Sequence, residues 1–276
     1  MTAPSTQTEQ TETAQRVTVS IDDHIAEVVL NRPEKHNALD FAMFEGISAA
    51  IDEVAADPSV RAVVLRGEGK SFCSGLDIMS FASEGRDVHD MFARRPGEPA
   101  NLAQRVAYGW QTMPAPVIAA VHGNCIGGGA QIALGADVRI IAPGSRVSIR
   151  EGYWGLVPDM GITRTLPRLV RFDVAKELVL TARIIEAEEA VRVGLATRLD
   201  DDPLAAARAL AAEIAERSPD ATRRGKDLLE RAWNLPAEES LALEQELQTE
   251  LLGSANQLKA VGAGMSGEPA DFDDPA

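Results

Sequence analysis

The sequence contains two glycine-bearing segments, each preceded by a short β-like run. GNCIGGGAQ at residues 123–131 follows PVIAAV at 116–121, and SFCSGLDIM at 71–79 follows VRAVVLR at 60–66. Glycine lets the backbone approach a neighbour or a ligand closely, so each segment should expose main-chain N–H groups at a strand end. If the two loops converge, their N–H groups can bind one carbonyl oxygen as negative charge develops on it.

Composition and charge limit the class of protein. The chain has 276 residues, 45% of them hydrophobic, enough for a large core with an appendage. A net charge of −15 disfavours nucleic-acid partners, whose phosphates require Lys and Arg. No apolar run reaches the roughly 18 residues of a membrane span, no secretory leader is visible, and the two cysteines are too few for a disulfide framework. We therefore expect a cytoplasmic protein without membrane insertion.

β-like and helix-like segments alternate between residues 16 and 200. Strands are expected at 17–20, 25–30, 60–66, 117–121 and 138–141, and helices at 41–55, 102–111, 128–135 and 174–180. This alternation predicts an α/β fold. After residue 200 the apolar spacing is helical throughout, with helices expected at 204–216, 221–233 and 238–252.

These patterns divide the chain into four parts: a disordered tail at 1–15, the core at 16–200, a helical region at 201–266 and a disordered acidic tail at 267–276. The helical region could pack on its own core or on a neighbouring subunit. The polar stretch 80–99 is expected to be a long mobile excursion over the site. No internal sequence repeat is visible.

Other glycine-loop chemistries fit the sequence less well. A P-loop would need glycine where Val64 stands, and contiguous glycines do not match a dinucleotide fingerprint. The segment 123–127 matches a nucleophile elbow with Cys125 as the nucleophile, but all four histidines precede it in the chain. These histidines are scattered singly, without metal-ligand spacing, so no metal site is expected.

Two carboxylates are candidates for proton transfer. Glu151 and Asp159 flank the irregular segment GYWGLVP, whose apolar residues Tyr153, Trp154, Leu156 and Val157 could surround both acids. Such desolvation raises a carboxylate pKa toward the range useful for proton transfer. The spacing alone leaves open the alternative that both acids are ordinary solvated loop residues without a catalytic role.

Four motifs, taken in order, resemble the crotonase (enoyl-CoA hydratase/isomerase) superfamily: LNRPEKHNAL at 30–39, FCSGLDI at 72–78, IAAVHGNCIGGG at 118–129 and GLVPD at 155–159. The resemblance implies a spiral of repeated ββα turns and a C-terminal helical region used in trimer formation. It also implies acyl-CoA thioester substrates and no separate cofactor, since coenzyme A is part of the substrate.

The resemblance also assigns site residues. The oxyanion donors fall on the backbone N–H groups of Leu76 and Gly128, and the coenzyme A portion is expected along the Lys35 region and the 74–78 loop. The substrate-binding residues implied in this way are Arg32, Lys35, Ser74, Asp77 and Ile78.

The reaction depends on Gln131, Glu151 and Asp159. Hydratases of the family use two glutamates, whose matching positions here hold Gln131 and Glu151. An amide cannot exchange a proton at neutral pH, so addition of water by paired glutamates is in doubt. Asp159 matches a catalytic aspartate of dienoyl-CoA isomerases, although these carry a further aspartate where Gln131 stands, and ring-epoxide isomerases also show GLVPD.

The preferred hypothesis is a double-bond isomerase. Its alternatives are a hydratase with Glu151 as the main acid/base and a non-catalytic acyl-CoA-binding protein. A homotrimer or a dimer of trimers is expected.

Overall fold

A six-stranded sheet organises the core. The structure is a computed structural model that describes residues 15–83, 85–94 and 96–275. The strands lie in the order β1 (Val17–Asp22), β2 (Ile25–Leu30), β3 (Ala62–Gly67), β4 (Val117–Val121), β6 (Val138–Ile141) and β9 (Arg198–Leu199). β1 and β2 are antiparallel, and every later neighbour in this sheet is parallel.

A second, smaller sheet lies at the ends of these strands. It consists of β5 (Asn124–Ile126), β7 (Arg146–Ser148) and β8 (Ile185–Glu186), and single bridges continue it from Cys125 to Cys73 and from Leu76 to Leu39. Each turn of the chain therefore supplies a long strand, a short extended segment in the second layer and then a helix. This arrangement confirms the predicted α/β spiral of ββα units.

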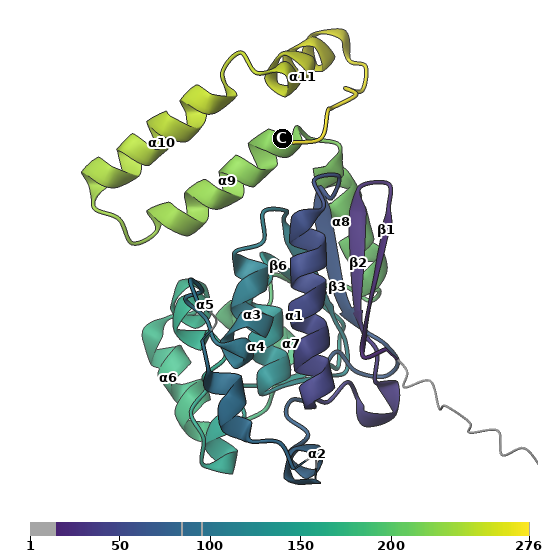
Figure 1. Cartoon of the computed structure of the whole chain (residues 1–276), viewed down its shortest axis with the longest axis vertical. Helices are drawn as coiled ribbons and strands as arrows, with labels where there is room; N and C mark the ends of the chain where they lie inside the picture. The colour runs from purple at the N-terminus through teal and green to yellow at the C-terminus, as the bar shows by residue number, and fades with distance from the viewer. Residues whose placement is uncertain (1–14, 84, 95, 276) are drawn as a thin grey trace, which may run out of the picture.

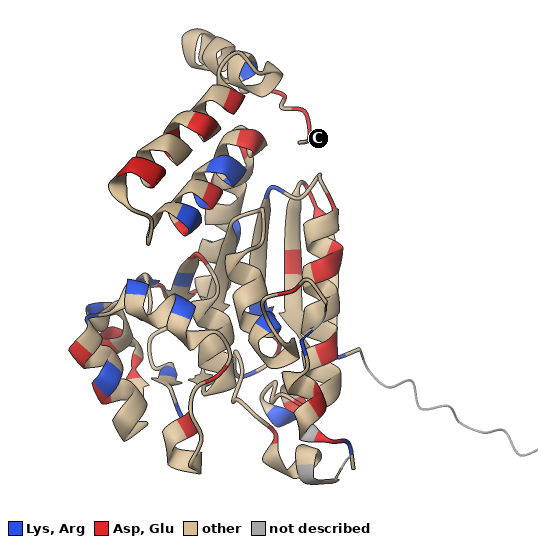
Figure 2. Ribbon diagram, turned by 60° about the vertical axis from the view of Figure 1, so that its left-hand side comes forward, with Lys and Arg blue, Asp and Glu red and all other residues tan. Residues whose placement is uncertain are grey.

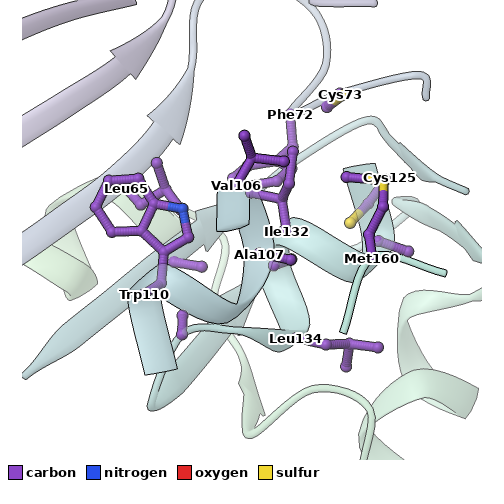
Figure 3. Close-up of a cluster of buried hydrophobic side chains, with 14 of the residues drawn as sticks. Leu65, Phe72, Cys73, Val106, Ala107, Trp110, Cys125, Ile132, Leu134 and Met160 are labelled. Carbon is purple, nitrogen blue, oxygen red and sulfur yellow. The ribbon is translucent and has the colours of Figure 1, made fainter. Parts of the chain in front are cut away.

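The helices of the turns cover one face of the large sheet (Figure 1). They include α1 (Phe41–Ala56), α3 (Leu102–Gln111) and α4 (Gly128–Leu134). Figure 3 shows Trp110 and Val106 of α3 beside Ile132 of α4 and Phe72, and all four side chains are buried. This apolar cluster fixes α4, and with it the GGG segment, against the strand ends.

Shorter elements complete the core. They are η1 (Pro33–Lys35), α2 (Ile78–Ser83), η2 (Val88–Phe92), η3 (Glu151–Trp154), α5 (Ile162–Leu169), α6 (Phe172–Thr181) and α7 (Ala187–Val193). The stretch 80–99, expected to be a long mobile excursion, contains the end of α2 and the 3₁₀ helix η2. Phe81 of α2 contacts Phe41, with ring centroids 4.4 Å apart, so apolar packing holds this segment on the core.

The core extends further along the chain than the sequence predicted. Helix α8 (Pro203–Ala215) covers the opposite face of the large sheet, where Ala207 and Ala211 pack against Val64, Ile118 and Ile140. Alanine allows a helix to lie close to a sheet, so the helical spacing after residue 200 does not mark a separate part. Helix α8, which begins just after the predicted boundary at 200, packs on the sheet of the core.

The remaining helices form an arm that projects from the core (Figure 1). The arm consists of α9 (Pro219–Ala232), α10 (Ala237–Leu251) and α11 (Ala255–Ser266). Figure 2 shows acidic residues along the ribbon of the core and of the arm alike. Across the residues described, no helix is long and apolar enough to span a membrane.

The acidic tail is placed against the core, contrary to the prediction of disorder at 267–276. Phe272 is only 7% exposed, and its carbonyl oxygen accepts a hydrogen bond of 2.9 Å from the Arg61 guanidinium. Asn256 of α11 and Asp273 exchange two hydrogen bonds of 2.9 Å. One buried aromatic and a buried guanidinium are enough to order a segment whose composition is otherwise polar. The tail predicted at 1–15 lies outside the described residues except for Gln15.

Replacing the buried ring tests this tail contact. We expect Phe272→Ala to lower the free energy of unfolding by about 2–4 kcal/mol, because truncating a buried aromatic removes apolar contacts. Chemical denaturation of the purified protein measures the loss. The matched control is Asp271→Ala at the exposed neighbouring position, which should change stability by less than about 0.5 kcal/mol. Equal stability of both variants would contradict the placement of Phe272.

Candidate active site

The two glycine loops meet at the second layer of the spiral. Gly75 has a φ of +89°, and a Cβ built on it would lie 2.7 Å from the carbonyl oxygen of Ile126 and 3.7 Å from the nitrogen of Gly128. Any side chain at position 75 would push the loops apart. The sequence prediction that the loops converge is therefore matched by the backbone geometry.

The N–H groups of Leu76 and Gly128 remain free in this arrangement. Leu39 pairs with both neighbours of Leu76, donating to the carbonyl of Gly75 at 2.8 Å and accepting from the N–H of Asp77 at 2.9 Å. Successive N–H groups of an extended segment point in opposite directions, so the Leu76 N–H faces away from Leu39. Gly128 is the first residue of α4, whose N–H has no partner within the helix. Within the described part of the chain, neither group donates to an acceptor.

The three contiguous glycines each meet a different constraint. Gly127 has a φ of +55° and a ψ of −122°, a conformation that side chains disfavour. A Cβ on Gly128 would lie 2.8 Å from the Leu39 side chain and 2.9 Å from the Met160 sulfur, and a Cβ on Gly129 would lie 2.4 Å from the carbonyl oxygen of Cys73. The run thus both permits close packing and exposes the Gly128 amide.

The thiols do not form a nucleophilic site. Cys73 and Cys125 are both buried, and burial raises the pKa of each thiol well above its ordinary value. A buried, protonated thiol is a poor nucleophile. Among the described residues, no three His, Cys, Asp or Glu side chains gather into a group that could hold a metal ion.

Gln131 links the two acidic positions. Its side-chain nitrogen donates to Glu151 Oε1 at 2.6 Å, and its side-chain oxygen accepts from the Met160 backbone N–H at 2.9 Å. Met160 directly follows Asp159, so one amide group fixes both Glu151 and the end of the segment that carries Asp159. The other oxygen of Glu151, Oε2, is buried and has no hydrogen-bond partner among the described residues.

The environment raises the pKa of both acids. For Glu151, burial raises the pKa and the nearby charge of Asp159 adds to the effect, outweighing hydrogen bonds from its own backbone and from Gln131. Burial also raises the pKa of Asp159, against a hydrogen bond from its own backbone. Burial is the largest effect on both pKa values, and the charge of Asp159 is the smallest of the effects on Glu151.

The source of this desolvation differs from the sequence expectation. Tyr153, Trp154, Leu156 and Val157 do not surround the acids but are exposed on the single chain. Glu151 is half-buried because its carboxylate lies against the α4 entrance, where a Cβ on Gly127 would be 3.5 Å from Oε1. Asp159 is the more exposed of the two acids.

The residues expected along coenzyme A fall into two groups. Lys35 and Ile78 are exposed, and Ser74 is partly exposed and donates through its backbone N–H to the carbonyl oxygen of His36 at 3.0 Å. Arg32 and Asp77 instead form a largely buried ion pair at 2.8 Å. The Arg32 guanidinium is thus enclosed beside the Asp77 and Asp40 carboxylates, and its expected contact with the substrate stays a prediction.

Asn37 was not predicted as a site residue, and its side chain links Arg32 to the start of the first glycine loop. This fully buried side chain accepts from the Arg32 backbone N–H at 2.8 Å and donates to the carbonyl oxygen of Ser71 at 2.7 Å. Its φ of +56° is a conformation that asparagine tolerates better than most residues. In the sequence, only the asparagine after His36 pointed to a residue in a left-handed conformation. In the structure both residues have positive φ.

The comparison with known families agrees with this geometry. The Enoyl-CoA hydratase/isomerase family model matches residues 20–272. The chain belongs to this family. The match confirms the resemblance to the crotonase superfamily and shows an enzyme family whose substrates are acyl-CoA thioesters.

Enoyl-CoA hydratase/isomerase family members of different activity are similar to the chain. The mitochondrial Delta(3,5)-Delta(2,4)-dienoyl-CoA isomerase of Mus musculus is 34% identical over 254 residues, covering 89% of this chain and 78% of the mouse protein. The short-chain-enoyl-CoA hydratase of Clostridium acetobutylicum is 34% identical over 242 residues, covering 87% and 90%. The crystal structure of an enoyl-CoA hydratase from Bacillus anthracis superimposes with a TM-score of 0.85 at 26% identity, covering 95% of this chain and 100% of that one.

Removing the Gln131 amide should shift the titration of Glu151. The hydrogen bond from the Gln131 amide stabilises the charged carboxylate of Glu151 and so lowers its pKa. Because Gln131→Leu removes this bond, we expect the variant to raise the pKa of Glu151 further. The carboxyl ¹³C shift of labelled glutamate, followed against pH, measures this change, and Glu151→Gln identifies the signal. An unchanged or lowered pKa would show that the amide does not control this acid.

Proposed function

We propose that the protein shifts a double bond in an enoyl-CoA or dienoyl-CoA, through an enolate bound by the N–H groups of Leu76 and Gly128. The observation that carries this proposal is the Gln131 side chain, which is fixed between Glu151 and Met160 and supplies no second acid. Two carboxyl groups with raised pKa then remain for proton transfer, Glu151 and Asp159.

The two N–H groups act on the thioester carbonyl. Hydrogen bonds that strengthen as the oxygen becomes negative stabilise the enolate more than the substrate, which lowers the barrier to removing a proton from the adjacent carbon. Neither N–H must first leave a protein acceptor in the described chain. The donors are therefore already in place before the substrate binds.

The two acids then move one proton each. For a 3,5-dienoyl-CoA, the ionised carboxylate removes a proton from C2, and the electrons delocalise over the chain and the thioester oxygen. The protonated carboxyl delivers a proton to C6, leaving a 2,4-dienoyl-CoA of unchanged mass. This cycle requires one ionised and one protonated carboxyl group, and the pKa of both Glu151 and Asp159 is raised.

Hydration by Glu151 is the second candidate, favoured by the hydratases among the similar proteins. Addition of water needs a group that holds and deprotonates the water. The Gln131 amide is buried and cannot take a proton from the water, so it does not supply this group. We therefore place hydration behind isomerisation.

Binding and assembly follow the same proposal. The coenzyme A portion would run past Lys35, Ser74 and Ile78, and no cofactor beyond the substrate is invoked. We propose a homotrimer or a dimer of trimers, supported by large apolar side chains that are exposed on the arm of the single chain: Leu229, Trp233, Leu241, Leu252, Leu258 and Met265.

Isomerase activity and the two acids are tested together. Purified protein given a 3,5-dienoyl-CoA should produce the conjugated 2,4-isomer, seen as a new ultraviolet absorbance without a change of mass. We expect Glu151→Gln and Asp159→Asn each to lower kcat by about 10²- to 10⁴-fold, the usual contribution of a general acid or base. Glu188→Gln at an exposed position is the control and should leave kcat unchanged. Full activity of Asp159→Asn would exclude its assigned role.

Restoring a glutamate separates the two candidates. We expect Gln131→Glu to increase addition of water to a 2-enoyl-CoA, because the new carboxyl group can exchange a proton beside Glu151. Mass spectrometry detects the added water. Faster hydration than isomerisation by the unmodified protein would overturn the isomerase proposal, and tight binding of many acyl-CoA thioesters without turnover would favour a binding protein.

A further inference from the structure

Arg32 lies beneath the loop that presents the Leu76 N–H. It is 6% exposed, and its Nη1 lies 2.8 Å from Asp77 Oδ2 and donates to the carbonyl oxygen of Ala38 at 3.0 Å. Its Nε lies 3.4 Å from Asp40 Oδ2, and Nη2 donates to the Ser80 hydroxyl at 3.4 Å. The Arg32 guanidinium therefore contacts both sequence neighbours of Leu39, Ala38 and Asp40. It also contacts Asp77, the residue after Leu76.

Asp77 transmits this contact to the loop. Its backbone N–H donates to the carbonyl oxygen of Leu39 at 2.9 Å, while its carboxylate accepts from the Ser80 N–H at 3.1 Å and the Ser80 hydroxyl at 2.7 Å. The peptide unit that carries the Leu76 N–H is thus followed directly by a residue fixed at both its backbone and its side chain. Leu76 itself is 42% exposed, so side-chain packing contributes little to its position.

Charge gives Arg32 a second role. Asp77 is adjacent in sequence to a hydrogen-bond donor that must stabilise negative charge, and an uncompensated carboxylate there would oppose an enolate. Burial alone would raise the pKa of Asp77, but hydrogen bonds from Ser80 and the charge of Arg32 outweigh it and keep the carboxylate ionised. Arg32 neutralises this ionised group.

We propose that Arg32 is a positioning residue for the enolate site: through its ion pair with Asp77 it holds the Leu76 N–H toward Gly128 and neutralises the carboxylate behind it. This inference rests on the proposed function, since it assigns Arg32 to the same enolate. It differs from the role of a substrate-binding residue that the family resemblance implies for Arg32.

Three variants separate positioning from simple stability. Arg32→Met removes the charge at similar length, and Arg32→Lys keeps a charge but cannot reach all four partners. The matched control is Arg16→Met, because Arg16 also pairs with Asp40, at 3.0 Å, and is not paired with Asp77. All kinetic values are normalised to the folded fraction measured by circular dichroism.

The expected result is a loss of kcat that stability does not explain. Arg32→Met should lower kcat by about 10- to 100-fold, Arg32→Lys should recover part of it, and Arg16→Met should lower the melting temperature alone. Acetoacetyl-CoA gives a second signal, because its enolate absorbs in the near ultraviolet. Arg32→Met should weaken the bound enolate signal while the affinity for free coenzyme A stays unchanged.

Adding Asp77→Asn tests the charge effect. The double variant Arg32→Met, Asp77→Asn should recover part of the kcat lost in Arg32→Met, because the uncompensated carboxylate is gone. Equal loss of kcat in Arg16→Met, or unchanged kcat in Arg32→Met, would overturn the inference. Weaker binding of free coenzyme A in step with the thioester would make Arg32 a substrate-binding residue instead.

The failure of the proposed function gives a different result. In that case the unmodified protein neither isomerises dienoyl-CoA nor stabilises the acetoacetyl-CoA enolate. Hydrogen exchange of residues 74–80, measured by mass spectrometry without any ligand, then decides the positioning claim. Faster exchange in Arg32→Met than in Arg16→Met supports it, and equal exchange overturns it. If Arg32→Met fails to fold, Asp77→Asn alone serves the same comparison.

Discussion

The close approach of two backbones is the constraint on which the site depends. Residues 73–76 and 124–129 run side by side at distances that leave no room for a side chain, with glycine at 75 and 129 facing Ile126 and Cys73. The spiral produces this contact because each turn places its short extended segment beside that of the preceding turn. Two free N–H groups therefore emerge at one place without any residue dedicated to carrying them.

Gln131 shows how one amide can determine which chemistry the site favours. An amide and a carboxyl have nearly the same shape, but only the carboxyl exchanges protons at neutral pH. Here the amide donates to Glu151 and accepts from the backbone N–H of Met160, the residue after Asp159. Under the proposed function, the lack of proton exchange at position 131 favours moving a double bond over adding water. Both a hydratase and an isomerase are similar to the chain in sequence.

The strands and helices that could be predicted are those whose own residues show a β-branched run or a helical spacing of apolar residues. β2 has the predicted bounds, and α1 differs by one residue, because β-branched runs and helical spacing are local properties. The short strands β5 and β8 exist only through pairing with distant segments. The ion pairs of Arg32 could not be predicted either, because the fold brings its carboxylate partners to it. The helical spacing of α8 does not reveal the sheet that this helix covers. The ββα repeat leaves no sequence repeat because its loops differ in length from turn to turn.

The ordered tail changes how the arm is attached. The arm leaves the core through α9 and returns to it through Phe272, whose carbonyl is bound by Arg61 just before β3. A segment tethered at both ends has far fewer orientations than one that swings from a single hinge, so less rotational entropy remains to be lost when another surface docks on it. The described end of the chain, through Phe272, thereby helps to keep the apolar faces of α9–α11 in a set direction.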